Sequence, residues 1–284
     1  MNPPSPAGSD AAEQARWLPG GRPGDARTLP LFLLPPAGGA AALYRDDRWQ
    51  DDRRRDTGSV GVGVTGYPVE LPGRGARLAE PLVTELEELV RRLDDACRPR
   101  HGEPWAVLGH SMGALLATAW AAHACRLGHG PRALYLSAAA PPWHSRAPLE
   151  LTAGDDAQLW RALSGLGGVS PAQLASPAAA RYLTRIMRAD LTAVVPLCLR
   201  APEPLGCPVV VLSGAEDPAC PPELLDGWRE LAGGAHAATR LPGAHFYRCG
   251  LGDLAPVVRA DLAGRLAGRL AGELTAATVP AAPR

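Results

Sequence analysis

Continuous apolar runs recur along the chain between polar or Gly/Pro-rich segments, and they predict a parallel β-sheet. The runs occupy residues 29–34, 60–71, 105–108, 133–137 and 208–213, and a shorter run covers 238–241. Because most of these runs lack polar alternation, we expect strands that are covered by helices on both faces. Residues 79–97 between two of the runs have apolar positions at a helical period. Strands that alternate with helices in this way predict an α/β fold with a mostly parallel, doubly wound sheet.

Residues 141–204 interrupt this alternation. They contain no strand-like run, only amphipathic helical pieces at about 155–163, 171–175 and 177–199. We expect this insertion to form a helical lid over the carboxyl ends of the strands, where ligands of open α/β sheets bind. The predicted domain covers 29–275. Residues 1–28 are rich in Pro and Gly and predict a disordered lead-in, and 276–284 predict a C-terminal tail.

The composition excludes several classes of partner. The formal net charge is zero, with 29 basic and 29 acidic residues, so neither nucleic acid nor a membrane surface is expected as a partner. No apolar run is long enough for a transmembrane helix, and the N-terminus lacks the apolar core of a signal peptide. The six cysteines are far apart without a C-x-x-C pair. We therefore expect a cytoplasmic protein with reduced thiols and no metal site.

The strongest candidate for chemistry is Gly109-His110-Ser111-Met112-Gly113, which lies between a strand-like run and a segment of good helix formers. A G-x-S-x-G in this setting is typical of a nucleophile elbow, in which Ser111 is exposed at the end of the sheet. The N–H of Met112 would then face the oxyanion that forms when Ser111 attacks a carbonyl. After the first strand, Pro36 has no N–H, so Ala37 is the expected second oxyanion donor. An ordinary tight turn is the alternative for either segment.

A serine nucleophile needs a base and an orienting carboxylate. Of the seven histidines, His245 follows the serine in sequence and directly follows the last predicted strand. Asp217 directly follows the 208–213 strand and is the preferred acid, with Glu216 and Asp226 as competitors. A structural role for Asp217, as a cap of the following helix, remains the alternative.

Taken together, several motifs resemble those of the type II thioesterases, discrete α/β-hydrolases that accompany polyketide synthases and nonribosomal peptide synthetases. The motifs are Leu-Pro-Pro-Ala-Gly-Gly at 34–39, Leu-Tyr-Arg at 43–45, Leu-Pro-Gly-Arg-Gly at 71–75 with Arg77, Gly-His-Ser-Met-Gly-Ala-Leu-Leu at 109–116 and Gly-Ala-His-Phe at 243–246. The resemblance covers roughly residues 29–270. Two departures are Pro36, where the family usually has an aromatic residue or His, and the charged segment 46–56.

The resemblance implies hydrolysis of acyl thioesters on the phosphopantetheine arm of carrier proteins, by a monomer that needs no cofactor of its own. Because carrier proteins are generally acidic, Arg181, Arg185 and Arg188 on one side of a lid helix are a candidate docking face. The alternatives are a small-ester carboxylesterase or lipase, a serine acyltransferase and a non-catalytic binding protein with the same fold.

Overall fold

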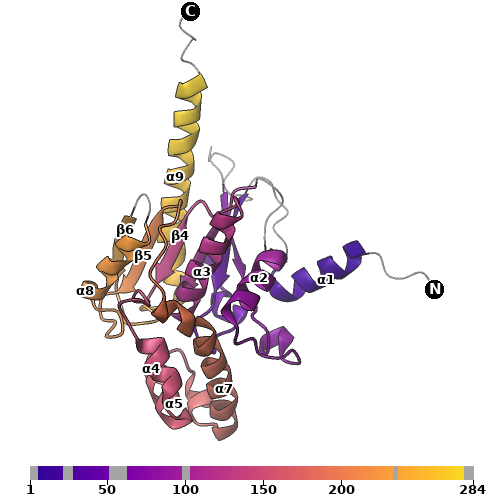
Figure 1. Ribbon diagram of the computed structural model, residues 1–284, viewed down its shortest axis with the longest axis vertical. Helices are drawn as coiled ribbons and strands as arrows, with labels where there is room; N and C mark the ends of the chain where they lie inside the picture. The colour runs from indigo at the N-terminus through magenta and orange to yellow at the C-terminus, as the bar shows by residue number, and fades with distance from the viewer. Residues whose placement is uncertain (1–5, 22–27, 51–62, 98–102, 233–235, 278–284) are drawn as a thin grey trace, which may run out of the picture.

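The computed structural model describes residues 6–21, 28–50, 63–97, 103–232 and 236–277, and its centre is a parallel sheet (Figure 1). Six strands pair in the order β2-β1-β3-β4-β5-β6, and every pairing is parallel. The strands are β1 (Thr28–Leu34), β2 (Gly63–Pro68), β3 (Ala106–His110), β4 (Leu134–Ser137), β5 (Val209–Gly214) and β6 (His236–Leu241). This sheet confirms the predicted α/β fold.

Helices cover both faces of the sheet, as the continuous apolar runs predicted. Alternate residues of β1 belong to two different buried clusters, so Phe32 packs with α2 and α3 while Leu31 packs with α9. The helices outside the lid are α1 (Pro6–Trp17), α2 (Leu86–Cys97), α3 (Met112–Arg126), α8 (Pro222–Leu225) and α9 (Leu254–Ala277). Short 3₁₀ helices are η1 (Ala41–Tyr44), η2 (Asp47–Trp49), η3 (Gly75–Arg77), η5 (Asp226–Glu230) and η6 (Leu251–Asp253). Among the described helices, none combines the length and hydropathy required to cross a membrane.

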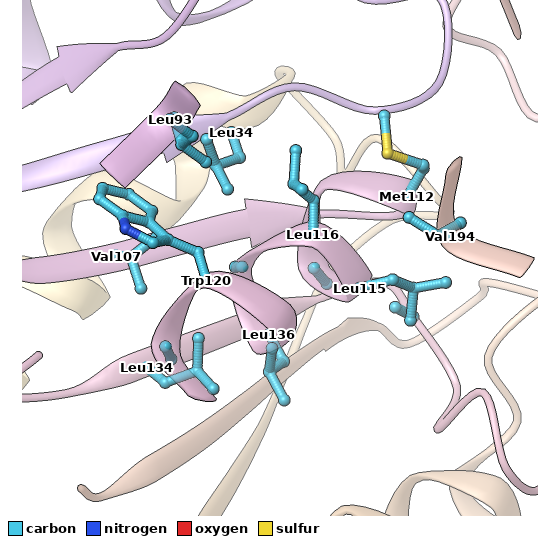
Figure 2. Packing of buried hydrophobic residues seen from close by; sticks show 14 of the residues in the cluster. Leu34, Leu93, Val107, Met112, Leu115, Leu116, Trp120, Leu134, Leu136 and Val194 are labelled. Atoms are coloured by element: carbon cyan, nitrogen blue, oxygen red, sulfur yellow. The ribbon is translucent and has the colours of Figure 1, made fainter. Parts of the chain in front are cut away.

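Helix α3 is buried because it crosses the middle of the sheet. Figure 2 shows Trp120 of α3 close to Val107 of β3, and Leu116 and Met112 in the same cluster, which also contains Leu93 of α2 and Val194 of α7 (Pro177–Val194). All of these side chains are buried. The helix that follows Ser111 is therefore held by packing along most of its length.

The N-terminal segment differs from the predicted disordered lead-in. Residues Pro6–Trp17 form α1, and Trp17 and Leu18 are buried. The guanidinium of Arg77 lies 4.0 Å from the centre of the Trp17 ring, and the N–H of Glu70 donates to the Trp17 carbonyl at 2.8 Å. Two adjacent large apolar residues thus anchor a segment whose Pro and Gly content suggested no core contact. Residues 1–5 and 22–27 of the lead-in lie outside the described part of the chain.

Helix α2 is shorter than predicted. The apolar period suggested a helix from Ala79, but α2 begins at Leu86. Pro81 disfavours a helical conformation in the residue before it, and Leu82 instead packs against Gly73, where a Cβ atom would lie 2.5 Å from the Leu82 side chain. The residues before Leu86 therefore form a loop that packs against the Leu-Pro-Gly-Arg-Gly segment and do not extend the helix.

Between β4 and β5, the segment for which a lid was expected contains only helices. They are α4 (Ala147–Ala153), α5 (Asp156–Ser164), α6 (Pro171–Leu174), α7 (Pro177–Val194) and η4 (Val195–Leu199). Asp155, Ser170 and Ser176 cap three of them by accepting a hydrogen bond from a backbone N–H in the first turn. Figure 1 shows α4, α5 and α7 grouped at the end of the molecule opposite to the end of α9.

The charged segment 46–56 is described only as far as Gln50, and its remainder lies outside the described residues. Asp46 caps η2 and pairs with Arg48, which also contacts Asp253 at 3.1 Å. Trp49 of the same helix is buried. This part of the segment is therefore fastened to the domain by an aromatic anchor as well as by mixed charges.

Candidate active site

The order of the strands places the loops after β1 and β3 next to each other. From β1 the chain crosses to β2 on one side, and it then returns to β3 on the other side. Such a reversal opens a crevice at the carboxyl ends of the two strands, where ligands bind. The register pairs Leu34 with Gly109, so the loop that contains Ala37 lies beside the turn that contains Ser111.

Ser111 occupies a strained turn between β3 and α3. Its backbone has φ 55° and ψ −122°, a conformation that costs about 1–3 kcal/mol for a residue with a side chain. Both flanking glycines are needed for close packing: a Cβ at Gly109 would collide with the backbone of Gly113, and a Cβ at Gly113 would lie 2.5 Å from the Leu34 carbonyl oxygen. The sequence pattern therefore forms the predicted elbow, pressed against the loop after β1.

His245 and Asp217 meet although 28 positions separate them. His245 Nδ1 lies 2.8 Å from Asp217 Oδ2, and both side chains are buried. Burial raises the pKa of Asp217, but hydrogen bonds from His245, Ala219 N–H and Cys220 outweigh it, and the pKa falls below its ordinary value. Since Asp217 is then ionised, Nδ1 must carry the shared proton. The other ring nitrogen, His245 Nε2, is buried and has no hydrogen-bond partner among the described residues.

Cys220 is a neighbour of this pair that the sequence did not single out. One ligand atom from each of Asp217, Cys220 and His245 lies within 4.8 Å of the others, a spacing that a metal ion could bridge. Burial and the Asp217 charge raise the pKa of the Cys220 thiol, so the thiol keeps its proton and donates a hydrogen bond to the Asp217 carboxylate. Cys220 and His245 thus both hydrogen-bond to the Asp217 carboxylate.

A second chain of hydrogen bonds lies under His245. His110 Nδ1 is 2.9 Å from Ser137 Oγ, which is 2.6 Å from the hydroxyl of Tyr247. The His110 and His245 rings are 5.1 Å apart. Burial, together with His245, lowers the pKa of His110 well below its ordinary value, so His110 is neutral and supports His245 without adding charge.

Ser111 and His245 line the same cavity of about 340 Å³, between the sheet and the lid. The loop after β1 forms one wall, including Ala37. The lid contributes apolar side chains, namely Leu163, Leu166, Val169, Leu183, Ile186 and Met187. The structure thus brings Ala37, Ser111 and His245 to one chamber. Met112, the other oxyanion-donor candidate, directly follows Ser111 at the start of α3, and Asp217 is hydrogen-bonded to the histidine.

The competing acids lie elsewhere. Glu216 and Asp226 are exposed, and Asp226 is part of η5 and pairs loosely with Arg229 at 3.4 Å. Neither is hydrogen-bonded to His245, whose Nδ1 partner is Asp217.

The candidate docking face on α7 differs from the expectation at one residue. Arg188 is turned into the lid, where its guanidinium donates to Asp156 at 2.9 Å and to the Thr152 and Gly154 carbonyls. Arg181 and Arg185 are exposed. The predicted three-residue face therefore retains two arginines.

A larger hollow of about 690 Å³ lies between α2, α3 and residues 197–203. Its polar lining consists mainly of charged groups, including Glu87 and Arg200, which pair at 2.9 Å. It includes none of Ser111, Asp217 or His245. The smaller cavity is the candidate active site because it combines a nucleophile with a base.

Known proteins resemble this chain in sequence and in fold. A family model described as "Thioesterase domain" matches residues 29–260. The solved structure of RedJ, a thioesterase from the prodiginine pathway of Streptomyces coelicolor, is 32% identical with a TM-score of 0.69, covering 87% of this chain and 94% of RedJ. The type II thioesterase BorB, from the borrelidin biosynthetic cluster, is 28% identical with a TM-score of 0.68, covering 86% of this chain and 95% of BorB.

Another relative, Linear gramicidin dehydrogenase LgrE from Brevibacillus parabrevis, is named as a dehydrogenase rather than as a thioesterase. It is 31% identical over 239 residues, which make up 82% of this chain and 87% of that protein. The family model covers most of the sequence, and the two solved structures extend over nearly the same length. The chain therefore belongs to the thioesterase domain family, as its motifs predicted.

Proposed function

We propose that this thioesterase removes acyl groups from the phosphopantetheine arm of carrier proteins in a polyketide synthase or nonribosomal peptide synthetase, through an acyl-enzyme on Ser111. The observation that carries the proposal is the arrangement at His245. Its Nδ1 is held by an ionised carboxylate. Its Nε2, which has no hydrogen-bond partner in the described part of the chain, is buried in the site whose cavity Ser111 also lines. A base oriented in this way can accept the serine proton. The biosynthetic pathways named for RedJ and BorB support the assembly-line context.

In the first half of the reaction, His245 Nε2 takes the proton from Ser111 as its Oγ attacks the thioester carbonyl. The carbonyl oxygen becomes negative, and the N–H groups of Met112 and Ala37 stabilise it. Met112 opens α3, whose first N–H groups have no partner within the helix. When the tetrahedral intermediate collapses, the C–S bond breaks and His245 returns the proton to the departing pantetheine sulfur.

In the second half, water replaces the serine as nucleophile. His245 takes a proton from the water, the resulting hydroxide adds to the acyl-serine, and collapse of the intermediate breaks the ester bond. Ser111 regains its proton from His245, and the carboxylic acid leaves. Asp217 stabilises the imidazolium in both halves without taking a proton itself, in line with its lowered pKa.

The cavity supports an acyl substrate rather than a large polar one. About 340 Å³ is near the lower end of the roughly 300–1,000 Å³ typical of ligand pockets, and the lid wall is mostly apolar, with Gln173 and Tyr182 as its polar side chains. A small-ester carboxylesterase or lipase and a serine acyltransferase would use the same groups. Hydrolysis of matched thioesters and oxygen esters separates the first alternative, and product analysis with an added alcohol or amine separates the second. A non-catalytic binding protein would leave Ser111 unlabelled by a fluorophosphonate.

The partner is proposed to be an acidic carrier protein that docks near the lid, with Arg181 and Arg185 as its contacts. We propose that the enzyme acts as a monomer in the cytoplasm and needs no cofactor, since the chemistry above uses only its own side chains and water. The six cysteines are free thiols, which is in keeping with a reducing compartment. Reversal of both charges, Arg181→Glu with Arg185→Glu, should raise KM for an acyl-carrier protein and leave KM for an acyl-N-acetylcysteamine thioester unchanged.

The central experiment is mass spectrometry of carrier proteins loaded with short, branched and long acyl groups after incubation with the enzyme. We expect conversion to the free phosphopantetheine form with the wild-type protein and none above background with Ser111→Ala. Ser145→Ala is the matched control, because this serine lies outside the cavity lining and should leave the activity unchanged. Retained activity in Ser111→Ala would exclude the proposed nucleophile.

A further inference from the structure

A buried ion pair joins the lid to the segment after β2. Arg74 NH1 and NH2 donate to the two carboxylate oxygens of Asp190 at 2.6 and 2.5 Å, across 116 positions of sequence. Each of the two residues is only 3% exposed. Arg74 belongs to the Leu-Pro-Gly-Arg-Gly segment and Asp190 to α7, so the pair connects the core domain to the longest helix of the lid.

The same two side chains also hold the loop after β1. Asp190 Oδ2 accepts a hydrogen bond from the N–H of Gly38 at 2.8 Å. Arg74 NH1 donates to the carbonyl of Gly39 at 3.2 Å. Gly38 directly follows Ala37, the proposed oxyanion donor. The pair therefore binds the N–H of Gly38 and the carbonyl of Gly39, the two residues that follow Ala37.

Helix α7 contacts this loop a second time, one turn before Asp190. A Cβ atom at Gly38 would lie 2.7 Å from Cγ of Met187, so the loop backbone and the helix are in direct contact. Gly38 also has φ +74°, a conformation that suits glycine. A polar contact and an apolar contact from the same helix thus act on the same loop residue.

Stability is a weak explanation for this pair. Removing two charges from water costs several kcal/mol per ion, and replacing a buried ion pair with apolar residues is often neutral or stabilising. Here the carboxylate and the guanidinium form hydrogen bonds with the loop backbone in addition to those they form with each other. A loop that must present an N–H at a defined point needs such contacts, because small displacements of an oxyanion donor are costly.

We propose that Arg74 and Asp190 are positioning residues of the thioesterase reaction, which hold the N–H of Ala37 in the oxyanion hole and make its geometry depend on the seating of α7 against the core. The inference rests on the proposed function in one respect, the assignment of Ala37 as an oxyanion donor. It predicts that loss of the pair lowers the rate of attack by Ser111 rather than the binding of the substrate.

The test compares Asp190→Asn, which removes the charge of the pair, with the double variant Arg74→Met/Asp190→Leu. The double variant leaves no unpaired buried charge, so it keeps the question answerable if the single variant does not fold. Asp94→Asn is the control. Asp94 is a buried carboxylate that accepts from Trp120 Nε1 at 2.9 Å and does not line the active-site cavity.

Two assays are applied to each folded variant. The first gives kcat and KM for a short acyl-N-acetylcysteamine thioester, and the second gives the rate constant of Ser111 labelling by a fluorophosphonate. We expect both variants of the pair to lose about 10- to 100-fold in kcat and in labelling, with KM within about twofold of the wild type. Asp94→Asn should keep both rates, even with a lowered melting temperature. Wild-type rates in the double variant, or a loss confined to KM, would overturn the proposal. Labelling without thioester hydrolysis by the wild type would refute the proposed function instead, and the labelling rates would still decide the inference.

Discussion

Replacement of Asp217 by Asn tests the proposed charge arrangement with almost no change in side-chain shape. In the wild type, Asp217 accepts hydrogen bonds at both oxygens, from His245 Nδ1 at 2.8 Å and from Ala219 N–H at 2.9 Å. Asparagine has only one acceptor oxygen. If that oxygen stays with Ala219, the amide NH₂ faces Nδ1 and forces the His245 proton onto Nε2, where the imidazole can no longer accept the proton of Ser111.

The expected loss follows from this change of tautomer. We expect kcat to fall by about 10³- to 10⁴-fold, which corresponds to about 4–5.5 kcal/mol of lost transition-state stabilisation. KM for an acyl-N-acetylcysteamine thioester should change little, because Asp217 lies behind His245 and does not line the cavity. The assay follows release of the free thiol with a chromogenic disulfide reagent.

The two exposed acids that compete with Asp217 in the sequence provide matched controls. Glu216→Gln and Asp226→Asn each remove a carboxylate that is close in sequence but exposed and not hydrogen-bonded to His245, so both should retain wild-type kcat within about twofold. A well-folded Asp217→Asn enzyme with more than a tenth of the wild-type kcat would refute the proposed orienting role. An equal loss in either control would transfer that role to another residue.

Three further predictions address the supports of the site. The unfolded state binds a proton near pH 6.5 that the buried, neutral His110 does not, so stability is lost as the pH falls below that value. When the pH is lowered from about 7.5 to about 5.5, the free energy of unfolding measured in urea titrations should therefore decrease by about 1.4 kcal/mol less in His110→Gln than in the wild type. Equal decreases in the two proteins would contradict the buried neutral state. Gly113→Ala should push the Leu34 carbonyl away from the elbow and reduce kcat by more than about tenfold, whereas Gly264→Ala, in open space on α9, should be neutral or stabilising by up to about 1 kcal/mol. Trp17→Ala should destabilise the domain by about 3–5 kcal/mol in denaturant unfolding if α1 belongs to the folded unit, and a loss below about 1 kcal/mol would count against it.

Local patterns were sufficient for the sheet and for the elbow. Buried parallel strands must be apolar on both faces, so their positions are visible as continuous runs, and a strained serine turn requires glycines on both sides. The order of elements along the chain also identified a helical insertion and the histidine that follows the last strand. The apolar character of a buried strand and the glycines of a strained turn can be recognised from neighbouring residues, because burial and backbone strain act within one strand or one turn.

Other contacts between distant segments, outside the predicted active site, could not be read from local patterns. Trp17 and Leu18 gave no periodic signal, and Asp190 was one polar position in an amphipathic helix until the fold brought it to Arg74. Arg188 shared a helix face with Arg181 and Arg185 by spacing, but its hydrogen bonds to the α4–α5 region turn it into the lid. The sequence by itself determined which segments form strands, turns and helices, since backbone geometry and side-chain burial act locally. Only the tertiary structure decided that Arg74 pairs with Asp190 and that Arg188 turns into the lid, because those choices depend on how segments far apart in sequence pack against one another; Gly38 and Asp190, for example, are 152 positions apart.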